Sequence, residues 1–156
     1  YGSNTGFVLP EAVKEAGAKG TVLNHAEHKL TDDVIEKSIA RAKETGLLVM
    51  ACAESTERAR KIASFATKPD LIAIEPPELI GGNISVSTAK PEIISDTIKA
   101  VYSVAKIPVI TGAGIKNAAD VKKSIALGCK GVFVASGIVK SDNPKKAIKE
   151  IISGFD

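Results

Sequence analysis

Two short segments carry the side chains best suited to acid–base chemistry. The segment NHAEH (24–28) places the imidazole of His25 two residues before the carboxylate of Glu27, and Glu75 opens the segment EPPE (75–78). A carboxylate held partly out of water is a stronger base than a solvated one, and a neutral imidazole can polarise a carbonyl by donating a hydrogen bond to it. Together, such groups suit the removal of a proton from a carbon beside a carbonyl.

Two other segments consist mainly of glycine and small residues, TGAGI (111–115) and ASG (135–137). Small side chains let backbone N–H groups approach an anion closely, and this pattern favours phosphate as the anion. Ser136 has no histidine or acid near it in the sequence to activate it. We therefore expect its backbone N–H group to bind the anion, and we expect no catalytic role for its hydroxyl.

The elements that must hold these residues alternate along the chain. Helix-starting residues stand at Thr31, Pro91, Asn117 and Asn143, and a further helix is predicted over 9–16. Continuous apolar runs without polar alternation predict strands buried on both faces at 20–24, 47–52, 70–75, 108–112 and 131–135.

This alternation predicts an α/β fold with a parallel sheet and right-handed crossovers. Two architectures remain open, a doubly wound open sheet and a closed eight-stranded barrel. In both, the C-terminal ends of the strands form the active site, so the chemically capable segments are expected to meet there. The connection over 76–90 is long and shows little apolar periodicity, and we interpret it as a candidate lid.

Length and composition exclude several classes of protein. A chain of 156 residues with 44% hydrophobic and 25% charged residues is typical of one globular domain. The net charge of +3 is spread along the chain, which argues against nucleic acid or a membrane surface as a partner. No apolar run is long enough to span a membrane and no secretory signal is visible, so we expect a cytoplasmic protein.

Several residues are better explained by structure than by chemistry. Cys52 and Cys129 are predicted to be small buried hydrophobic residues, and Glu78 a solvated loop charge. His25 and His28 lack a third ligand at metal-binding spacing, so no metal site is expected. The last helix is expected to expose a solvated basic face made of Lys140, Lys145 and Lys146.

Four segments follow one another in the order and spacing of a known family. PEAVKEAGAKGTVLNHAEHKL (10–30), IAIEPPELIGG (72–82), TGAGI (111–115) and GVFVASGIVKSDNP (131–144) resemble the triosephosphate isomerases, especially their shorter archaeal branch, and the resemblance covers essentially the whole chain. It implies a (β/α)8 TIM barrel, of which about five strand–helix units, the fourth to the eighth, and the third helix are present. Residues 1–156 would then be the C-terminal part of a single barrel domain.

The resemblance also implies roles for individual residues. Glu75 would be the general base and His25 the neutral electrophile, with Glu27 as the carboxylate beside the histidine that pairs with a lysine. The backbone positions that grip the substrate phosphate would be Ile80, Gly81, Gly114, Ala135 and Ser136, and 76–87 would be the lid. The family's Asn-x-Lys segment in its first strand has no counterpart in residues 1–156, and Ala26 stands where the family usually has serine.

The activity implied is that of an intramolecular aldose–ketose isomerase of glycolysis and gluconeogenesis. It interconverts dihydroxyacetone phosphate and D-glyceraldehyde 3-phosphate through an enediolate, without a metal or organic cofactor. The resemblance further implies a cytoplasmic homo-oligomer, a dimer or a tetramer, whose partner is a small phosphorylated triose.

Two alternatives remain at this stage. The segment 131–144 also resembles the last strand and helix of pyridoxal-phosphate and thiazole synthases, but these need a Schiff-base lysine, and none of the five predicted strand ends supplies one. The other alternative is a non-catalytic barrel fragment, or a phosphate-binding open α/β module, that needs a completing partner.

Overall fold

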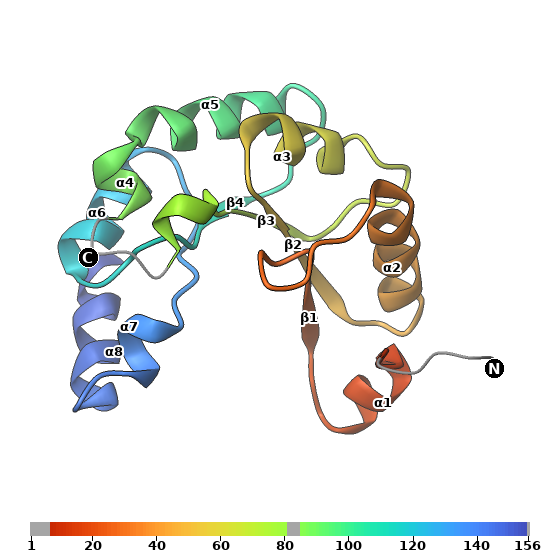
Figure 1. Ribbon diagram of the computed structural model, residues 1–156, viewed down its shortest axis with the longest axis horizontal. Coiled ribbons are helices and arrows are strands. Elements are labelled where there is room, and N and C mark those ends of the chain that lie inside the picture. Colours follow the sequence, from red (N-terminus) through yellow and green to blue (C-terminus); the bar gives the residue numbers. More distant parts are fainter. Residues whose placement is uncertain (1–6, 81–84, 156) are drawn as a thin grey trace.

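The computed structural model describes residues 7–80 and 85–155, and its helices and strands alternate as the sequence predicts (Figure 1). In chain order the elements are α1 (Pro10–Glu15), β1 (Gly20–Leu23), α2 (Asp32–Glu44), β2 (Leu48–Ala53), α3 (Thr56–Ala63), β3 (Leu71–Ile74), the 3-10 turn η1 (Pro77–Leu79), α4 (Val86–Ala89), α5 (Pro91–Tyr102), β4 (Val109–Thr111), α6 (Ala118–Ala126), α7 (Ser136–Val139), α8 (Pro144–Ile152) and the 3-10 turn η2 (Ser153–Phe155).

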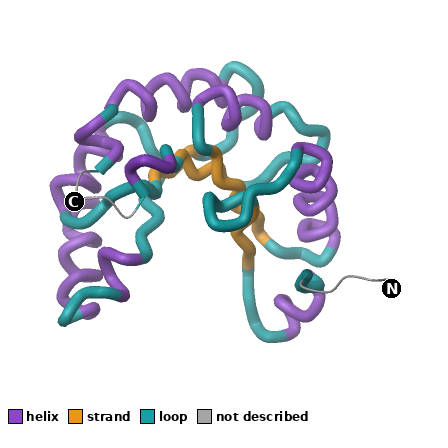
Figure 2. The backbone as a smooth tube through the Cα atoms, viewed as in Figure 1, coloured by secondary structure: helices purple, strands orange, loops and turns teal. Residues whose placement is uncertain are grey.

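The four strands form one parallel sheet in the consecutive order β1-β2-β3-β4. The strands line the inner side of an arc, and α2, α3, α5 and α6 form its outer side (Figure 2). A doubly wound sheet reverses its strand order at a switch point, whereas a barrel wall adds each strand beside the previous one. The observed order is therefore that of a barrel wall, and the doubly wound alternative is wrong.

The fifth predicted strand, 131–135, is reduced to a single parallel bridge between Thr111 and Val132. Lys130 N donates to the Val109 carbonyl and Phe133 N to the Thr111 carbonyl, both at 2.8 Å, so the segment does follow β4. No strand pairs with its other side among the described residues, and at Ala135 the backbone turns into α7. Because the segment turns away after a single bridge, it does not form the consecutive bridges that make β4 a strand.

The helices α2, α5, α6 and α8 begin at the predicted starting residues, although one of these residues makes no capping hydrogen bond. Asn117 and Asn143 cap α6 and α8 by accepting hydrogen bonds from the backbone N–H groups of Asp120 and Lys146. Thr31 precedes α2, but its side chain makes no capping hydrogen bond. The short helices α3, α4 and α7 were not predicted. The helices α4 and α7 have four residues each, which is too short to show a helical period, and α3 buries two alanines and one isoleucine.

The core lies between the sheet and the outer helices. Its largest cluster joins α2, β2, α3, β3 and α5, with fully buried side chains that include Ile35, Ile39, Ile62, Ile72 and Ile74. A second cluster contains Val86 of α4 together with Ile94, Ala113 and Cys129, and Leu79 and Ile80 pack against it. Both described ends of the predicted lid are thus packed against the barrel wall. Nowhere in 7–80 or 85–155 is a helix long and apolar enough to cross a membrane.

Asp70 connects helix α2 to the start of the sheet. Its carboxylate accepts hydrogen bonds from Lys43 Nζ and from Val49 N, both at 2.8 Å. Burial disfavours its charge, but the hydrogen bonds from Lys43 and Val49 outweigh burial and lower the pKa of Asp70 below its ordinary value of 3.8. A lowered carboxyl pKa stabilises the fold at pH values above the ordinary pKa, and this stability is lost as pH falls through the lowered pKa.

Asp70→Asn is therefore expected to lower the free energy of unfolding by about 1 kcal/mol at pH 7, a value reduced for partial exposure. As pH falls below about 4 the difference from the unsubstituted protein should shrink, because the carboxyl takes up a proton first in the unfolded chain and then, at its lowered pKa, in the folded protein. Urea unfolding at pH 7 and pH 3 measures both values. Asp33→Asn, which removes an exposed ion pair with Lys37 on α2, is the control and should change little. A deficit for Asp70→Asn that is the same at both pH values would contradict this account.

Candidate active site

Glu75 follows β3 directly and lies almost out of contact with water, at 4% exposure. Its backbone N–H donates to the Ala53 carbonyl at the end of β2, at 2.9 Å, so the parallel ladder continues to this residue. The side-chain atom Oε2 is buried and has no hydrogen-bond partner among the described residues. A buried carboxylate oxygen without a partner is costly for folding alone, and it is available to accept a proton from a ligand.

His25 lies at the end of β1 and points toward this carboxylate. The distance from His25 Nε2 to Glu75 Oε2 is 3.8 Å. On the other side of the ring, Glu27 N donates to His25 Nδ1 at 3.3 Å. Because this hydrogen bond needs a lone pair on Nδ1, the proton of the neutral imidazole lies on Nε2. His25 therefore presents a hydrogen-bond donor beside a carboxylate acceptor.

The side chain of Glu27 is exposed and interacts only weakly with His25. Its Oε2 lies 3.5 Å from His25 Nδ1, but the side chain is 90% exposed, so water screens its charge. Phe133 also contacts His25: the two rings meet edge to face, with their centroids 6.4 Å apart.

One cavity of about 350 Å³ brings the predicted site residues together. Every predicted residue within the described ranges lines it, namely His25, Glu27, Glu75, Ile80, Gly114, Ala135 and Ser136. Gly81 lies outside the described residues. The cavity also reaches Gly112, which lies in the predicted small-residue segment 111–115, and Lys116, Phe133 and Lys140, which were not predicted to belong to the site.

The cationic residues at the cavity show where sequence reasoning fell short. Lys140 was predicted to lie on the solvated face of the last helix, but it ends α7 and lines the cavity. A basic residue shortly after the small-residue segment 135–137 was the available signal. Glu78, predicted to be a solvated loop charge, is half exposed and paired with Lys90 at 2.5 Å, and this hydrogen bond lowers the pKa of Glu78.

The loop after β4 has a backbone that a ligand in the cavity could approach closely. Gly114 has a φ of +74°, in the left-handed region that glycine adopts without strain. Lys116 N donates to Asp120 Oδ2 at 3.1 Å, and Ser85 Oγ donates to Asp120 Oδ1 at 2.5 Å. One carboxylate thus joins this loop to the segment that precedes α4.

The cysteines are buried, as predicted. Burial, the nearby negative charge of Glu75 and a hydrogen bond to that carboxylate raise the pKa of Cys52 far above its ordinary value. Burial raises the pKa of Cys129 to about 12. Both thiols are therefore protonated at neutral pH. Across 7–80 and 85–155 no cluster of three or more His, Cys, Asp or Glu side chains could hold a metal ion.

The family model described as triosephosphate isomerase matches residues 1–154. The chain belongs to the triosephosphate isomerase family. The triosephosphate isomerase of Thermoplasma volcanium is 45% identical over 152 residues, covering 97% of this chain and 70% of that protein. The enzyme of Methanocaldococcus jannaschii is 44% identical over 152 residues, covering 97% of this chain and 68% of that protein. The chain thus spans about 70% of the length of such relatives.

Solved structures of low sequence identity show that the fold is shared more widely than the family. Tryptophan synthase from M. tuberculosis is similar with a TM-score of 0.69 at 17% identity, covering 94% of this chain and 54% of that one. Thiamine phosphate pyrophosphorylase from Pyrococcus furiosus gives a TM-score of 0.67 at 18% identity, covering 93% and 63%. The barrel architecture expected from the triosephosphate isomerase resemblance is thereby confirmed.

Gly112 leaves the space that Glu75 occupies. A Cβ atom at position 112 would lie 2.8 Å from Glu75 Cδ and 2.9 Å from Cγ, closer than real Cβ contacts allow. Gly112→Ala should therefore displace the carboxylate and lower kcat by about 100-fold, the cost of a misplacement near 1 Å.

Steady-state kinetics of the purified variant measures this loss. Gly131→Ala is the matched control, because a Cβ atom there would make an ordinary 3.4 Å contact with Ile110. Full activity in Gly112→Ala would show that the carboxylate does not depend on this space.

Proposed function

We propose that this chain provides the catalytic carboxylate and imidazole of a triosephosphate isomerase, which interconverts dihydroxyacetone phosphate and D-glyceraldehyde 3-phosphate. The observation that carries the proposal is the convergence of Glu75 and His25, 3.8 Å apart, in the cavity shared with Ile80, Gly114, Ala135 and Ser136. Curated relatives 42–45% identical to this chain are triosephosphate isomerases, and a non-catalytic phosphate-binding module is not favoured.

In the proposed reaction, Glu75 takes the proton from the hydroxymethyl carbon of dihydroxyacetone phosphate. The electron pair of the broken C–H bond forms the carbon–carbon double bond of an enediolate, and the negative charge moves to the former carbonyl oxygen. His25 Nε2–H donates a hydrogen bond to that oxygen and stabilises the charge. His25 gives its Nε2 proton to that oxygen and takes the proton of the neighbouring hydroxyl group, so the negative charge moves to the oxygen that becomes the aldehyde. Glu75 then returns its proton to the carbon that carried the carbonyl, and no net proton is gained or lost.

The phosphate group would lie at the end of the cavity lined by Ile80, Gly114, Ala135 and Ser136, and Gly81 is proposed to complete this set. Small residues there allow backbone N–H groups to approach the phosphate oxygens. Lys116 and Lys140 line the same cavity and add local positive charge. We assign Glu27 to the orientation of the imidazole, because its backbone N–H donates to His25 Nδ1 and leaves Nε2 directed at Glu75.

We further propose that residues 1–156 belong to a single barrel domain that assembles as a homo-oligomer, a dimer or a tetramer, in the cytoplasm. Phe7, Val8 and Leu9 are consecutive, apolar and 63–75% exposed. Such a patch is removed from water when it packs against another subunit. Analytical ultracentrifugation measures the state of assembly directly.

Glu75→Gln tests the role of the base. The amide cannot accept the substrate proton, so kcat should fall by about 1,000-fold in the protein at its natural length. The affinity for inorganic phosphate, measured by calorimetry, should stay within about threefold because the phosphate end of the cavity is untouched.

Glu54→Gln is the matched control, because Glu54 follows β2 as Glu75 follows β3 but does not line the cavity. Equal loss of turnover and phosphate affinity in Glu75→Gln, or retained turnover, would contradict the assignment of Glu75 as the base.

A further inference from the structure

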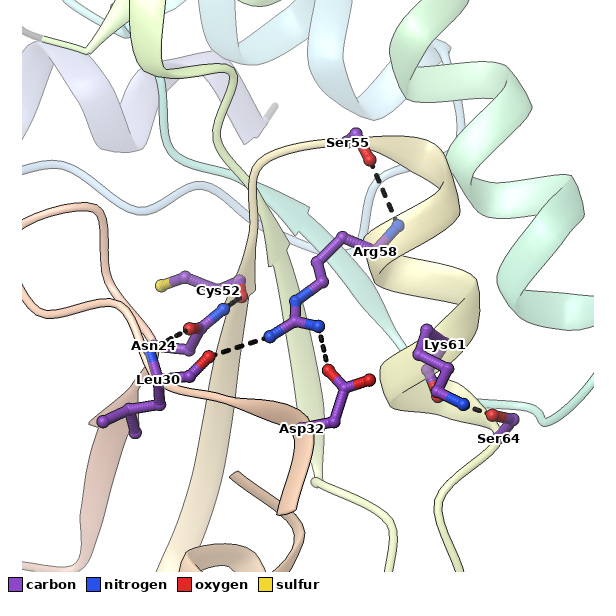
Figure 3. Close-up of polar contacts among 8 residues, drawn as sticks. All are labelled: Asn24, Leu30, Asp32, Cys52, Ser55, Arg58, Lys61 and Ser64. Carbon is purple, nitrogen blue, oxygen red and sulfur yellow. Dashed lines mark hydrogen bonds and ion pairs between the residues drawn. The ribbon is translucent and has the colours of Figure 1, made fainter. Parts of the chain in front are cut away.

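The loop that carries His25 is held at Leu30, its last residue, by the side chains of Asn24 and Arg58 (Figure 3). Asn24 precedes His25 and has a φ of +59°, in the left-handed region. Its Nδ2 donates to the Cys52 carbonyl, and its Oδ1 accepts from Leu30 N, both at 2.9 Å. One amide therefore joins the first residue of the loop, its last residue and the end of β2.

Arg58 on α3 holds the far end of the same loop. Its Nη2 donates to the Leu30 carbonyl at 3.0 Å, and its Nη1 pairs with Asp32 at the start of α2 (Figure 3). The side chain is only 21% exposed. Both backbone polar groups of Leu30 are thus bound by side chains, one from Asn24 and one from Arg58.

These contacts attach both the loop of His25 and the backbone of Glu75 to the C-terminal end of β2. Asn24 binds the Cys52 carbonyl, and the next carbonyl along β2, that of Ala53, accepts the hydrogen bond from Glu75 N. Loops generally move more than the elements that they connect. A loop whose two ends are fixed to β2 and α3 holds its imidazole at a set distance from the carboxylate.

We propose that Arg58 is a positioning residue that keeps His25 Nε2 directed at Glu75 by fixing the loop 24–30. The inference rests on the proposed function, in which His25 and Glu75 act on one substrate. Through these bonds Arg58 touches no residue that lines the 350 Å³ cavity, so its effect is exerted through Leu30 and Asn24. Its planar guanidinium supplies two separated donors, which an ammonium group cannot reproduce in the same geometry.

The guanidinium of Arg58 is largely buried although only part of its hydrogen-bonding capacity is used. Its Nε is buried and has no hydrogen-bond partner within the described residues. An unpaired buried donor is unfavourable for folding. Of the two bonds that the guanidinium makes, one goes to the loop of His25, at Leu30, and the other to the start of α2, at Asp32.

Arg58→Met removes both bonds but keeps an unbranched apolar chain of similar reach. We expect kcat to fall by about 10- to 100-fold, because the imidazole is misplaced while the phosphate end of the cavity is intact, and KM to change by less than about threefold. Arg58→Lys can restore one bond and should recover part of kcat. Arg60→Met, two residues along the same helix at an exposed position, is the matched control and should leave kcat within about twofold.

The second readout does not depend on turnover. The chain has two histidines, His25 and His28, so the imidazole proton resonances are few and a His28→Gln variant assigns them. Arg58→Met should shift or broaden the His25 resonances in the folded protein, and Arg60→Met should not. A lower melting temperature with unchanged His25 resonances and unchanged kcat would overturn the proposal and leave Arg58 a merely structural residue.

If Arg58→Met does not fold, Asn24→Gly is a second variant that tests whether the contacts to Leu30 position His25. Glycine retains the left-handed backbone at position 24 but loses both amide hydrogen bonds, so the same His25 resonances should shift. Unmoved resonances in this variant would also overturn the proposal. If the unsubstituted protein lacks isomerase activity, the proposed function fails, whereas a shift of His25 resonances in Arg58→Met still supports the positioning role.

Discussion

The parallel, consecutive register of the sheet is the constraint on which the site depends. Leu23 pairs with Ala51, Ala53 with Ile74, and Ile74 with Thr111, so the last residues of the four strands end at one edge. The residues that follow are the ones with chemical capability: His25 after β1, Glu75 after β3 and Gly112 after β4. A shift by one residue in any pair would turn alternate side chains to the opposite face.

Close packing around Glu75 keeps its carboxylate buried at this edge, as the proposed role of a base requires. Gly112 leaves room for the side chain, and the protonated thiol of Cys52 is hydrogen-bonded to the carboxylate. The consequence is a carboxylate whose free oxygen faces a cavity and a histidine donor, with water largely excluded. Burying an ionisable group in this way is costly, and catalytic sites are where such costs are found.

The end of the cavity that is proposed to bind phosphate is joined to the rest of the barrel wall by polar side chains. Asp120 bridges Ser85, ahead of α4, and Lys116, after β4, while Val86 and Ala113 share an apolar cluster. Fixed backbone at this end suits a ligand that must be held at its phosphate while a proton moves between its carbons.

The sequence by itself determined the alternation of strands and helices, the capping residues Asn117 and Asn143, and the segments NHAEH, EPPELIGG and TGAGI that resemble the triosephosphate isomerases. These are local features, since apolar periodicity and short motifs depend on neighbours along the chain. Strand order, the reduction of 131–135 to a bridge, the space at Gly112, the cavity position of Lys140 and the hold of Arg58 on Leu30 were decided only by the tertiary structure. Each of these joins residues far apart in sequence, and the space that one side chain leaves for another exists only after the sheet has formed.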